Sequence, residues 1–266
     1  MAKVICITNQ KGGVGKTTTA VNLSYYLSKA KQRVLLIDLD PQGNATSGLG
    51  FDVNEMEMAY NTETGVGNTM TEVMMGLKSL SDVILHTKYK NLDIAPTTPQ
   101  LANAEVELTK SNKKFVQLKK EVEKVFLNYD YIIIDSPPSL SLLTVNGMIA
   151  AEYLLLPVQT EFYAMQGVAQ LLESMKLVKK ATNPNLKLLG VVATMYDKRT
   201  TLSVQVLDEV KKYFKDKVFE TTIPRNVRVA EAPSHGVPVG EYQKFSKGAF
   251  AYKDLADEVM KRTMEM

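Results

Sequence analysis

The chain alternates short runs of apolar, often β-branched residues with longer segments in which apolar residues recur at helical spacing. The short runs are continuous and do not alternate with polar residues, which is typical of strands buried on both faces of a parallel sheet. They predict strands at Val4–Thr8, Val34–Asp38, Leu92–Ala95, Tyr131–Asp135, Tyr153–Val158, Leu188–Met195 and Val218–Ile223. The pattern therefore predicts an α/β fold, a mostly parallel twisted sheet with helices on both faces.

Three longer segments complete this picture. The spacing of apolar residues predicts one amphipathic helix over Ala102–Leu127 and a terminal helix, docked on the core, over Ala249–Met264. The segment Asn44–Asn68 has no clear period, and we expect surface loops and a short helix there. In parallel sheets ligands bind beyond the carboxyl ends of the strands. The polar residues that follow the predicted strands should therefore mark one shared edge.

A glycine-rich segment at that edge predicts a phosphate site. Val4–Ile7 is followed by Lys-Gly-Gly-Val-Gly-Lys-Thr-Thr, and such a turn between a strand and a helix points backbone N–H groups at phosphate oxygens. The expected contacts come from Lys11, Gly12, Gly13, Val14, Gly15, Lys16, Thr17 and Thr18. In a P-loop, Lys16 would reach the β- and γ-phosphates and Thr17 would ligate Mg²⁺. We therefore expect a fold of the P-loop NTPase type that binds ATP.

The loop departs from the usual P-loop pattern in two ways. Gln10 stands where the first glycine is expected, and Lys11 adds a second lysine. Lys11 cannot easily fold back onto the phosphates that Lys16 grips, so we interpret it as available to a nucleotide held by another subunit. The alternative is an ordinary solvated loop lysine.

Carboxylates at two further strand ends complete the expected hydrolytic site. Asp38 and Asp40 follow the second strand, and Asp135 ends an apolar strand in the manner of a Walker B element. Hydrolysis needs Mg²⁺ held by oxygen ligands and a group that positions water. We assign Asp40 to the water, Asp38 to the outer shell of the metal and Asp135 to a magnesium-bound water. The alternative is that these are structural aspartates at strand ends.

Composition narrows the class of protein. A chain of 266 residues can form one large core, and we expect a single domain over residues 1–266. The net charge of +3 means that nucleic-acid binding must come from a local basic patch. The single cysteine, Cys6, excludes sites that need several thiols. Without a signal-peptide pattern or a long apolar run, the protein is expected to be cytoplasmic.

Beyond the P-loop, several blocks resemble the ParA/Soj family of partition ATPases, within the deviant Walker A class that includes MinD. The blocks are DLDPQGNATSGL, DYIIIDSPPSL, PVQTEFYAMQG and IPRNVRVAEAPSHG. The resemblance implies that ATP is sandwiched in a homodimer, with Lys11 crossing to the partner's phosphates. It further implies non-specific DNA binding by the ATP-bound dimer, a place on the nucleoid, and hydrolysis stimulated by a ParB-like protein. The loop after Ile223 borders the adenine in this family, which makes Pro224, Arg225 and Asn226 base-site candidates.

Non-specific DNA binding requires Lys and Arg side chains spaced along one surface. The candidates lie in the second half of the chain: Arg199, Arg225, Arg228, Lys244 and Lys247, with Lys198 beside them and Lys211 and Lys212 as weaker candidates. Two other functions stay open. A MinD-like membrane-cycling ATPase would need a basic amphipathic C-terminal helix, for which the tail is short, and no membrane contact is expected. A P-loop metabolic ligase would need substrate-binding residues that the sequence does not reveal.

Overall fold

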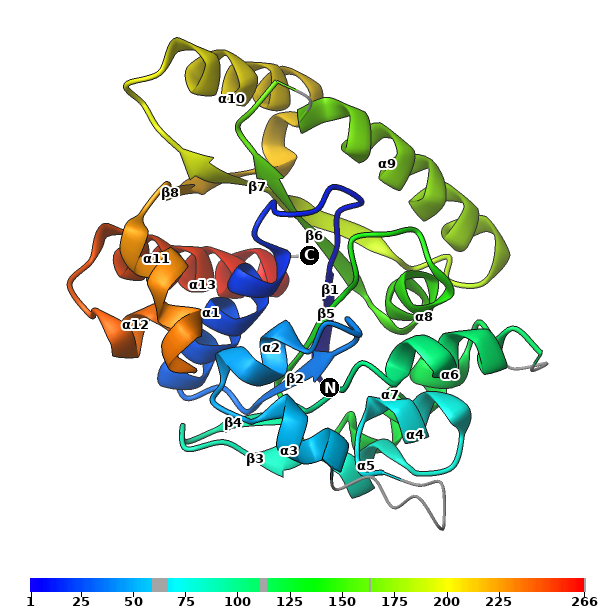
Figure 1. The fold of residues 1–266 in the computed structure, drawn as a ribbon. Coiled ribbons are helices and arrows are strands. Elements are labelled where there is room, and N and C mark those ends of the chain that lie inside the picture. The colour runs from blue at the N-terminus through cyan, green and yellow to red at the C-terminus, as the bar shows by residue number, and fades with distance from the viewer. Residues whose placement is uncertain (59–66, 111–113, 163, 266) are drawn as a thin grey trace.

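A twisted sheet runs through the middle of the molecule (Figure 1). The computed structural model describes residues 1–58, 67–110, 114–162 and 164–265. Within them the sheet has eight strands in the order β3-β4-β2-β5-β1-β6-β7-β8. The strands are β1 (Lys3–Ile7), β2 (Val34–Asp38), β3 (Leu85–His86), β4 (Leu92–Ala95), β5 (Tyr131–Asp135), β6 (Tyr153–Gln159), β7 (Lys187–Tyr196) and β8 (Val218–Pro224). All neighbouring strands in this part of the chain are parallel except β3 and β4.

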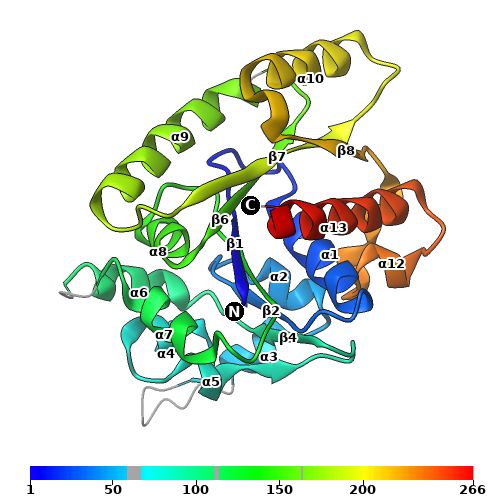
Figure 2. The same ribbon diagram turned by 180° about the vertical axis from the view of Figure 1, so that it is seen from behind.

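Helices cover both faces of the sheet, as Figures 1 and 2 show from opposite sides. One face carries α1 (Lys16–Lys29), α2 (Asn44–Gly48), α11 (Val227–Glu231), η2 (Ala232–His235), α12 (Val239–Tyr242) and α13 (Lys247–Glu265). The other carries α4 (Met70–Met75), α5 (Leu80–Val83), α6 (Leu101–Leu108), α7 (Gln117–Val125), α8 (Leu142–Ala150), α9 (Ala164–Ala181) and α10 (Thr201–Phe214). The short α3 (Val53–Met58) follows α2, and η1 (Lys215–Lys217) precedes β8.

The strands form where the sequence predicts them because their residues are apolar on both sides. In β1, Val4 and Cys6 pack in one core and Ile5 and Ile7 in the other. Alternating side chains thus fill two separate cores, which is why the runs are continuously hydrophobic. The predicted α/β fold, mostly parallel with helices on both faces, is confirmed, and Cys6 is fully buried. The antiparallel β3 was not predicted, because two residues give no pattern.

Pairing in register brings the polar strand ends together. Asp135 of β5 is opposite Ile7 of β1 on one side and Asp38 of β2 on the other. On the far side of β1, Gln159 of β6 is opposite Thr194 of β7. The loops after these strands therefore open onto one edge, as the sequence predicts.

Two predictions about helices were wrong in part. The predicted helix over Ala102–Leu127 is two helices, because the buried Asn146 of α8 bonds to the backbone just before α7 and in its first turn. Its Nδ2 donates to the Lys114 carbonyl (2.6 Å), and its Oδ1 accepts from the Leu118 N–H (3.4 Å). The segment predicted as surface loops and a short helix begins with α2, which buries Ala45 and Thr46, and continues into α3. The part of it at residues 59–66 lies outside the described residues.

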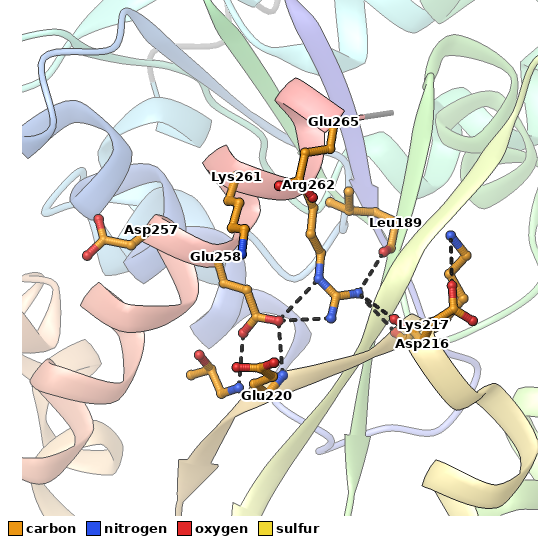
Figure 3. A pocket seen from close by; sticks show the side chains of 10 residues that line it. Leu189, Asp216, Lys217, Glu220, Asp257, Glu258, Lys261, Arg262 and Glu265 are labelled. Carbon is orange, nitrogen blue, oxygen red and sulfur yellow. Dashed lines mark hydrogen bonds and ion pairs between the residues drawn. The ribbon is translucent and has the colours of Figure 1, made fainter.

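The C-terminal helix α13 docks on the core, as predicted, and lies against β8 (Figure 2). Arg262 donates to Glu258 and to the backbone carbonyls of Leu189, Asp216, Lys217 and Val218, with its guanidinium 4.1 Å from the centre of the Phe219 ring. Glu258 in turn accepts the N–H groups of Glu220 and Thr221 (2.9 and 3.0 Å). The charged residues around the hollow in Figure 3 therefore clamp α13 to the edge strand β8. No helix within the described ranges is long and apolar enough to cross a membrane.

Candidate nucleotide-binding site

The loop between β1 and α1 has the backbone shape of an anion nest. Gly13 and Gly15 adopt φ values of 72° and 87°, a region that favours glycine because a residue with a Cβ atom is strained by its own backbone there. α1 begins directly after Gly15 without a side-chain cap, so its first N–H groups remain available to a ligand. The positive end of the helix dipole points at the same place. The arrangement fits phosphate oxygens.

Side chains from neighbouring strands hold this loop in position. Thr194 of β7 donates its hydroxyl to the Val14 carbonyl (2.8 Å). Asn9 donates from Nδ2 to the Pro157 carbonyl (2.8 Å), and its Oδ1 accepts the Lys11 N–H (3.0 Å). The nest is therefore preorganised by β6 and β7, and a phosphate would not have to fold it.

Lys16 lies buried at the start of α1. Its ammonium donates to the carbonyl of Lys11 across the loop (3.1 Å). Burial lowers the pKa of Lys16, while the negative charges of Asp135 and Asp40 act in the opposite direction. The ammonium thus lies inside the loop, where a bound phosphate could replace the Lys11 carbonyl as its partner.

Asp135 offers the clearest place for a cation. It is fully buried, and neither of its carboxylate oxygens has a hydrogen-bond partner in the described part of the chain. Burial raises the pKa of Asp135 well above its ordinary value and the charge of Asp38 adds to this, while the nearby Thr17 and Lys16 act against it. A buried carboxylate whose pKa is lowered only by the Thr17 side chain and Lys16, both at the phosphate nest, fits Mg²⁺. Across the described residues no cluster of three His, Cys, Asp or Glu forms, so the phosphates would have to supply further ligands.

The hydrogen bonds of Asp38 point to a different role from the one that the sequence suggests. Its Oδ2 accepts the N–H and the hydroxyl of Thr46 (2.8 and 2.7 Å), and its Oδ1 accepts the N–H of Asp40 (3.2 Å). Burial raises the pKa of Asp38 to about 6, and the Thr46 hydrogen bonds act against that shift. Strand β2 ends at Asp38, so Asp40 lies in the following turn and not on the same strand. In this geometry Asp38 holds the loop that carries Asp40, and its place in a metal's outer shell stays a prediction.

Lys11 points away from the nest. Its ammonium lies 3.9 Å from a carboxylate oxygen of Glu161, just beyond β6. The other oxygen of Glu161 accepts from Arg225 (3.1 Å) and from Gln159 (2.6 Å). The side chain of Lys11 is one-third exposed. The two lysines of the loop therefore face different surroundings.

The predicted basic residues lie around one groove at the ends of β7 and β8. Its lining includes Lys198, Arg199, Arg225, Arg228 and Lys247, together with the base-site candidates Pro224 and Asn226. Lys244, just before α13, lies 5.8 Å from the centre of the Phe245 ring. The weaker candidates Lys211 and Lys212 are exposed on α10.

Arg199 and Arg228 in this groove form ion pairs, and the base-site candidate Asn226 bonds to a neighbouring backbone N–H group. Arg199 forks onto Asp197 (2.9 and 2.7 Å), and Arg228 pairs with Glu231 (2.8 Å). Asn226 uses its Oδ1 to cap α11 at the N–H of Arg228 (3.0 Å). The roles of these residues stay predictions.

Comparison with known proteins decides the family. A family model described as an AAA domain matches residues 2–188. The chain is 51% identical over 259 residues to the sporulation initiation inhibitor protein Soj of Bacillus subtilis, covering 97% of this chain and 98% of that protein. It is 44% identical to the chromosome partitioning protein ParA of Myxococcus xanthus, covering 98% and 89% of the two chains. The chain belongs to the Soj/ParA family of partition ATPases.

A solved structure supports the same fold. It is described as cobyrinic acid a,c-diamide synthase from Mycobacterium smegmatis with bound ADP and magnesium, and is 36% identical with a TM-score of 0.84. The match covers 99% of this Soj/ParA-family chain and 96% of that one. That protein binds its nucleotide and metal on the same architecture.

Sequence reasoning missed the residues that hold the Soj/ParA site in place. Thr46, Thr194 and Glu161 contact Asp38, the P-loop and Lys11. Thr46 and Glu161 lie inside blocks that resemble the family, but nothing in those blocks or in the strand around Thr194 shows which residue each one contacts. A weak signal existed for Thr194 and Glu161, since both follow or end apolar strands at the functional edge. Tyr163, inside the PVQTEFYAMQG block, lies outside the described residues.

Proposed function

We propose that this protein is an Mg²⁺-dependent ATPase that segregates DNA by switching between a free state and an ATP-bound sandwich dimer. The observation that carries the proposal is the arrangement of the two loop lysines. Lys16 lies inside the phosphate nest, whereas Lys11 leaves it and approaches Glu161 near the surface. A lysine directed out of its own nest is suited to a nucleotide held by a second subunit.

The proposed chemistry follows from the places of the polar groups. Phosphates would bind the N–H groups of Gly12 to Thr18, and Lys16 would exchange the Lys11 carbonyl for a phosphate oxygen. Thr17 and, through water, Asp135 would hold Mg²⁺, which neutralises charge on the phosphates. Asp40, fixed by Asp38 and by its own bond to the Gln42 N–H (3.0 Å), would orient the attacking water. Pro224, Arg225 and Asn226 would border the adenine.

The DNA step of the proposal rests on the basic groove and on the family. Its cations would contact DNA phosphates without reading sequence, from both subunits of the dimer. Arg199 and Arg228 are the main candidates, with Arg225, Lys244 and Lys247 beside them. A ParB-like protein would stimulate hydrolysis and release the dimer from the nucleoid. The continuous sheet supports treating residues 1–266 as a single domain.

Replacing Asp40 with Ala tests the proposal. Nucleotide binding should survive, because the nest and Lys16 are intact, while hydrolysis should fall by about 100-fold, the usual contribution of a positioned general base. The variant should therefore accumulate as an ATP-bound dimer in light scattering with ATP and Mg²⁺. Asp208→Ala, an exposed change on α10, is the control and should behave like the wild type. A monomeric Asp40→Ala protein at saturating ATP would contradict the sandwich dimer.

A second candidate function has one observation in its favour. The similarity to the Mycobacterium structure described as a diamide synthase fits a P-loop enzyme that uses ATP to activate a carboxylate. ATP hydrolysis that depends on cobyrinic acid and a nitrogen donor, with amide formed in step, would establish it. ATPase activity that responds to DNA and not to these substrates favours partition.

A further inference from the structure

The turn that carries Arg199 is tied to the sheet by a chain of buried hydroxyl groups. Ser203 of α10 accepts the backbone N–H of Asp197 at its Oγ (3.1 Å). The same oxygen lies 2.6 Å from Oγ1 of Thr160, at the end of β6. Thr160 Oγ1 reaches the carbonyl of Thr194 on β7 (3.5 Å), to which the Thr160 N–H also donates (3.2 Å). Three neighbouring segments are thus linked in one place.

The two ends of this chain have fixed roles, whereas either hydroxyl could donate in the middle. The Asp197 N–H can only donate and the Thr194 carbonyl can only accept. The arrangement in which both hydroxyl protons are used has Ser203 donating to Thr160 and Thr160 donating to Thr194. Because the hydroxyl-bearing residues are 3%, 5% and 2% exposed, water cannot easily replace any member. Fully satisfied networks of this kind fix a local structure more firmly than separate bonds do.

Thr194 is also the residue that holds the P-loop. Its hydroxyl donates to Val14, while its carbonyl ends the chain that begins at Asp197. The phosphate nest and the Arg199 turn are therefore hydrogen-bonded to opposite ends of one buried residue.

Arg199 itself has little else to set its position. Its side chain is 84% exposed, and both its N–H and its guanidinium bond to Asp197 within the turn (3.0, 2.9 and 2.7 Å). The turn is closed by Thr200, whose N–H and hydroxyl donate to the Asp197 carbonyl (3.1 and 3.0 Å). Arg199 and Asp197 therefore move as one unit, and this unit is anchored to the sheet where Asp197 meets Ser203.

We propose that Thr160 and Ser203 are positioning residues that set the place of Arg199 for DNA through the Asp197 turn. This inference rests on the proposed DNA-binding function. A phosphate contact made from both subunits of a dimer needs each arginine at a fixed place relative to the two-fold axis. Loss of the hydroxyl chain frees the turn, so DNA must order it, and this entropy cost weakens binding.

The test compares Thr160→Val, which keeps the side-chain shape, with Thr160→Ser, which keeps the hydroxyl. Affinity for a random-sequence duplex is measured with ATP and Mg²⁺ at fixed salt. Thr160→Val should weaken DNA binding about fivefold, the usual worth of one internal hydrogen bond. Thr160→Ser, which keeps the hydroxyl, should bind DNA like the wild type. Ser203→Ala should give a similar loss, and since it contacts no P-loop residue its ATP affinity should equal that of the wild type.

A double-mutant cycle separates positioning from a general structural defect. In an Arg199→Ala background, Thr160→Val should cause no further loss of DNA affinity, because it acts through Arg199. An equal additional loss in both backgrounds would overturn the proposal. So would Thr160→Val and Ser203→Ala proteins that bind DNA as tightly as the wild type.

Hydrogen exchange provides a readout that does not need DNA. Amides of residues 195–202 should exchange faster in Thr160→Val and Ser203→Ala than in the wild type or Thr160→Ser. Unchanged exchange in both variants would overturn the positioning role. If the wild type itself failed to bind DNA with ATP, the proposed function would fall, while faster exchange would still support the anchoring of the turn.

Discussion

Asp135 costs the nucleotide-free protein stability at the position where a cation is expected. Its pKa is raised by burial, so the folded state binds its proton more tightly than the unfolded chain does. Below the unfolded value near 3.8 the carboxyl is protonated in both states and costs no stability, whereas stability is lost as the pH rises through the folded pKa. The proposed role of this residue would thus oppose stability at neutral pH.

Replacing Asp135 with Asn should therefore stabilise the nucleotide-free protein. We expect a gain of about 1–3 kcal/mol at pH 7, because Asn removes the buried negative charge whose desolvation is unfavourable, and a smaller gain as the pH approaches 4. Turnover should be lost. Thermal melts from pH 4 to 8, with and without Mg-ADP, measure both effects. A variant that melts below the wild type at pH 7 would show that Asp135 is structural.

Replacing each of the two loop lysines with Ala should impair a different step. Lys16 lies inside the nest, so Lys16→Ala should weaken nucleotide binding by the monomer at least tenfold, as expected for a charged hydrogen bond worth about 1.5–3 kcal/mol. Lys11→Ala should spare monomer binding and prevent ATP-driven dimerisation. A fluorescent ATP analogue and light scattering separate these results. Equal loss of nucleotide binding in both variants would contradict the assignment.

The sequence singles out candidate site residues but not the residues that support them in the structure. The P-loop, Asp38, Asp40 and Asp135 each stand in a local pattern that carries its own chemical meaning. Thr46 carries no such pattern, because its partner Asp38 becomes its neighbour only when α2 folds back over the end of β2. Asp38 was correctly placed at the edge, but its hydrogen bonds were not predictable.

At the scale of elements, strands were predictable because burial on both faces leaves a continuous apolar run. The helix over Ala102–Leu127 was predicted too long because its break depends on α8. Asn146 supplies a polar partner for the Lys114 carbonyl and the Leu118 N–H, which periodicity within the segment cannot reveal. The same limit applies to β8. Backbone N–H groups on its outer edge donate to a side chain of α13, which no pattern within the strand reveals.

Glu258→Gln tests how strongly α13 holds that edge. The carboxylate is 15% exposed and accepts from two strand N–H groups and from Arg262. Losing its charge should destabilise the protein by about 2 kcal/mol and lower the melting temperature by about 4–8 °C. Lys253→Ala, which breaks the exposed Lys253–Asp257 pair on the same helix, should cost less than about 0.5 kcal/mol. Equal melting temperatures for the two variants would contradict the clamp.

At the scale of the whole molecule, strand order separates two candidate sites along one edge. β2, β5 and β1 are neighbours in the sheet and deliver Asp38, Asp135 and the P-loop. The basic groove lies beyond them, at the ends of β7 and β8. Under the proposed mechanism, a nucleotide at the first place would control DNA at the second through dimerisation, since each subunit would bring its own groove to the two-fold axis.

Arg228→Glu tests this switch. In the wild type, DNA affinity should appear with ATP but not ADP, ignore sequence, and fall steeply between about 50 and 200 mM salt as counterion release loses its driving force. Arg228→Glu should abolish binding at moderate salt. For any residual binding, the slope of log affinity against log salt concentration should be smaller by about 2, because each of the two subunits loses one phosphate contact. ATP-driven dimerisation should be unchanged, because Arg228 lies outside the phosphate nest.

The matched control is Lys176→Glu on α9, which makes the same change of charge on the opposite face of the sheet. It should bind DNA like the wild type, because Lys176 lies outside the groove. Equal weakening in both variants would mean that net charge alone drives binding. Wild-type affinity in Arg228→Glu would remove Arg228 from the DNA surface. Binding that is equally tight with ATP and ADP would reject dimerisation as the switch, since two grooves that engage DNA separately gain nothing from closure of the nucleotide sandwich.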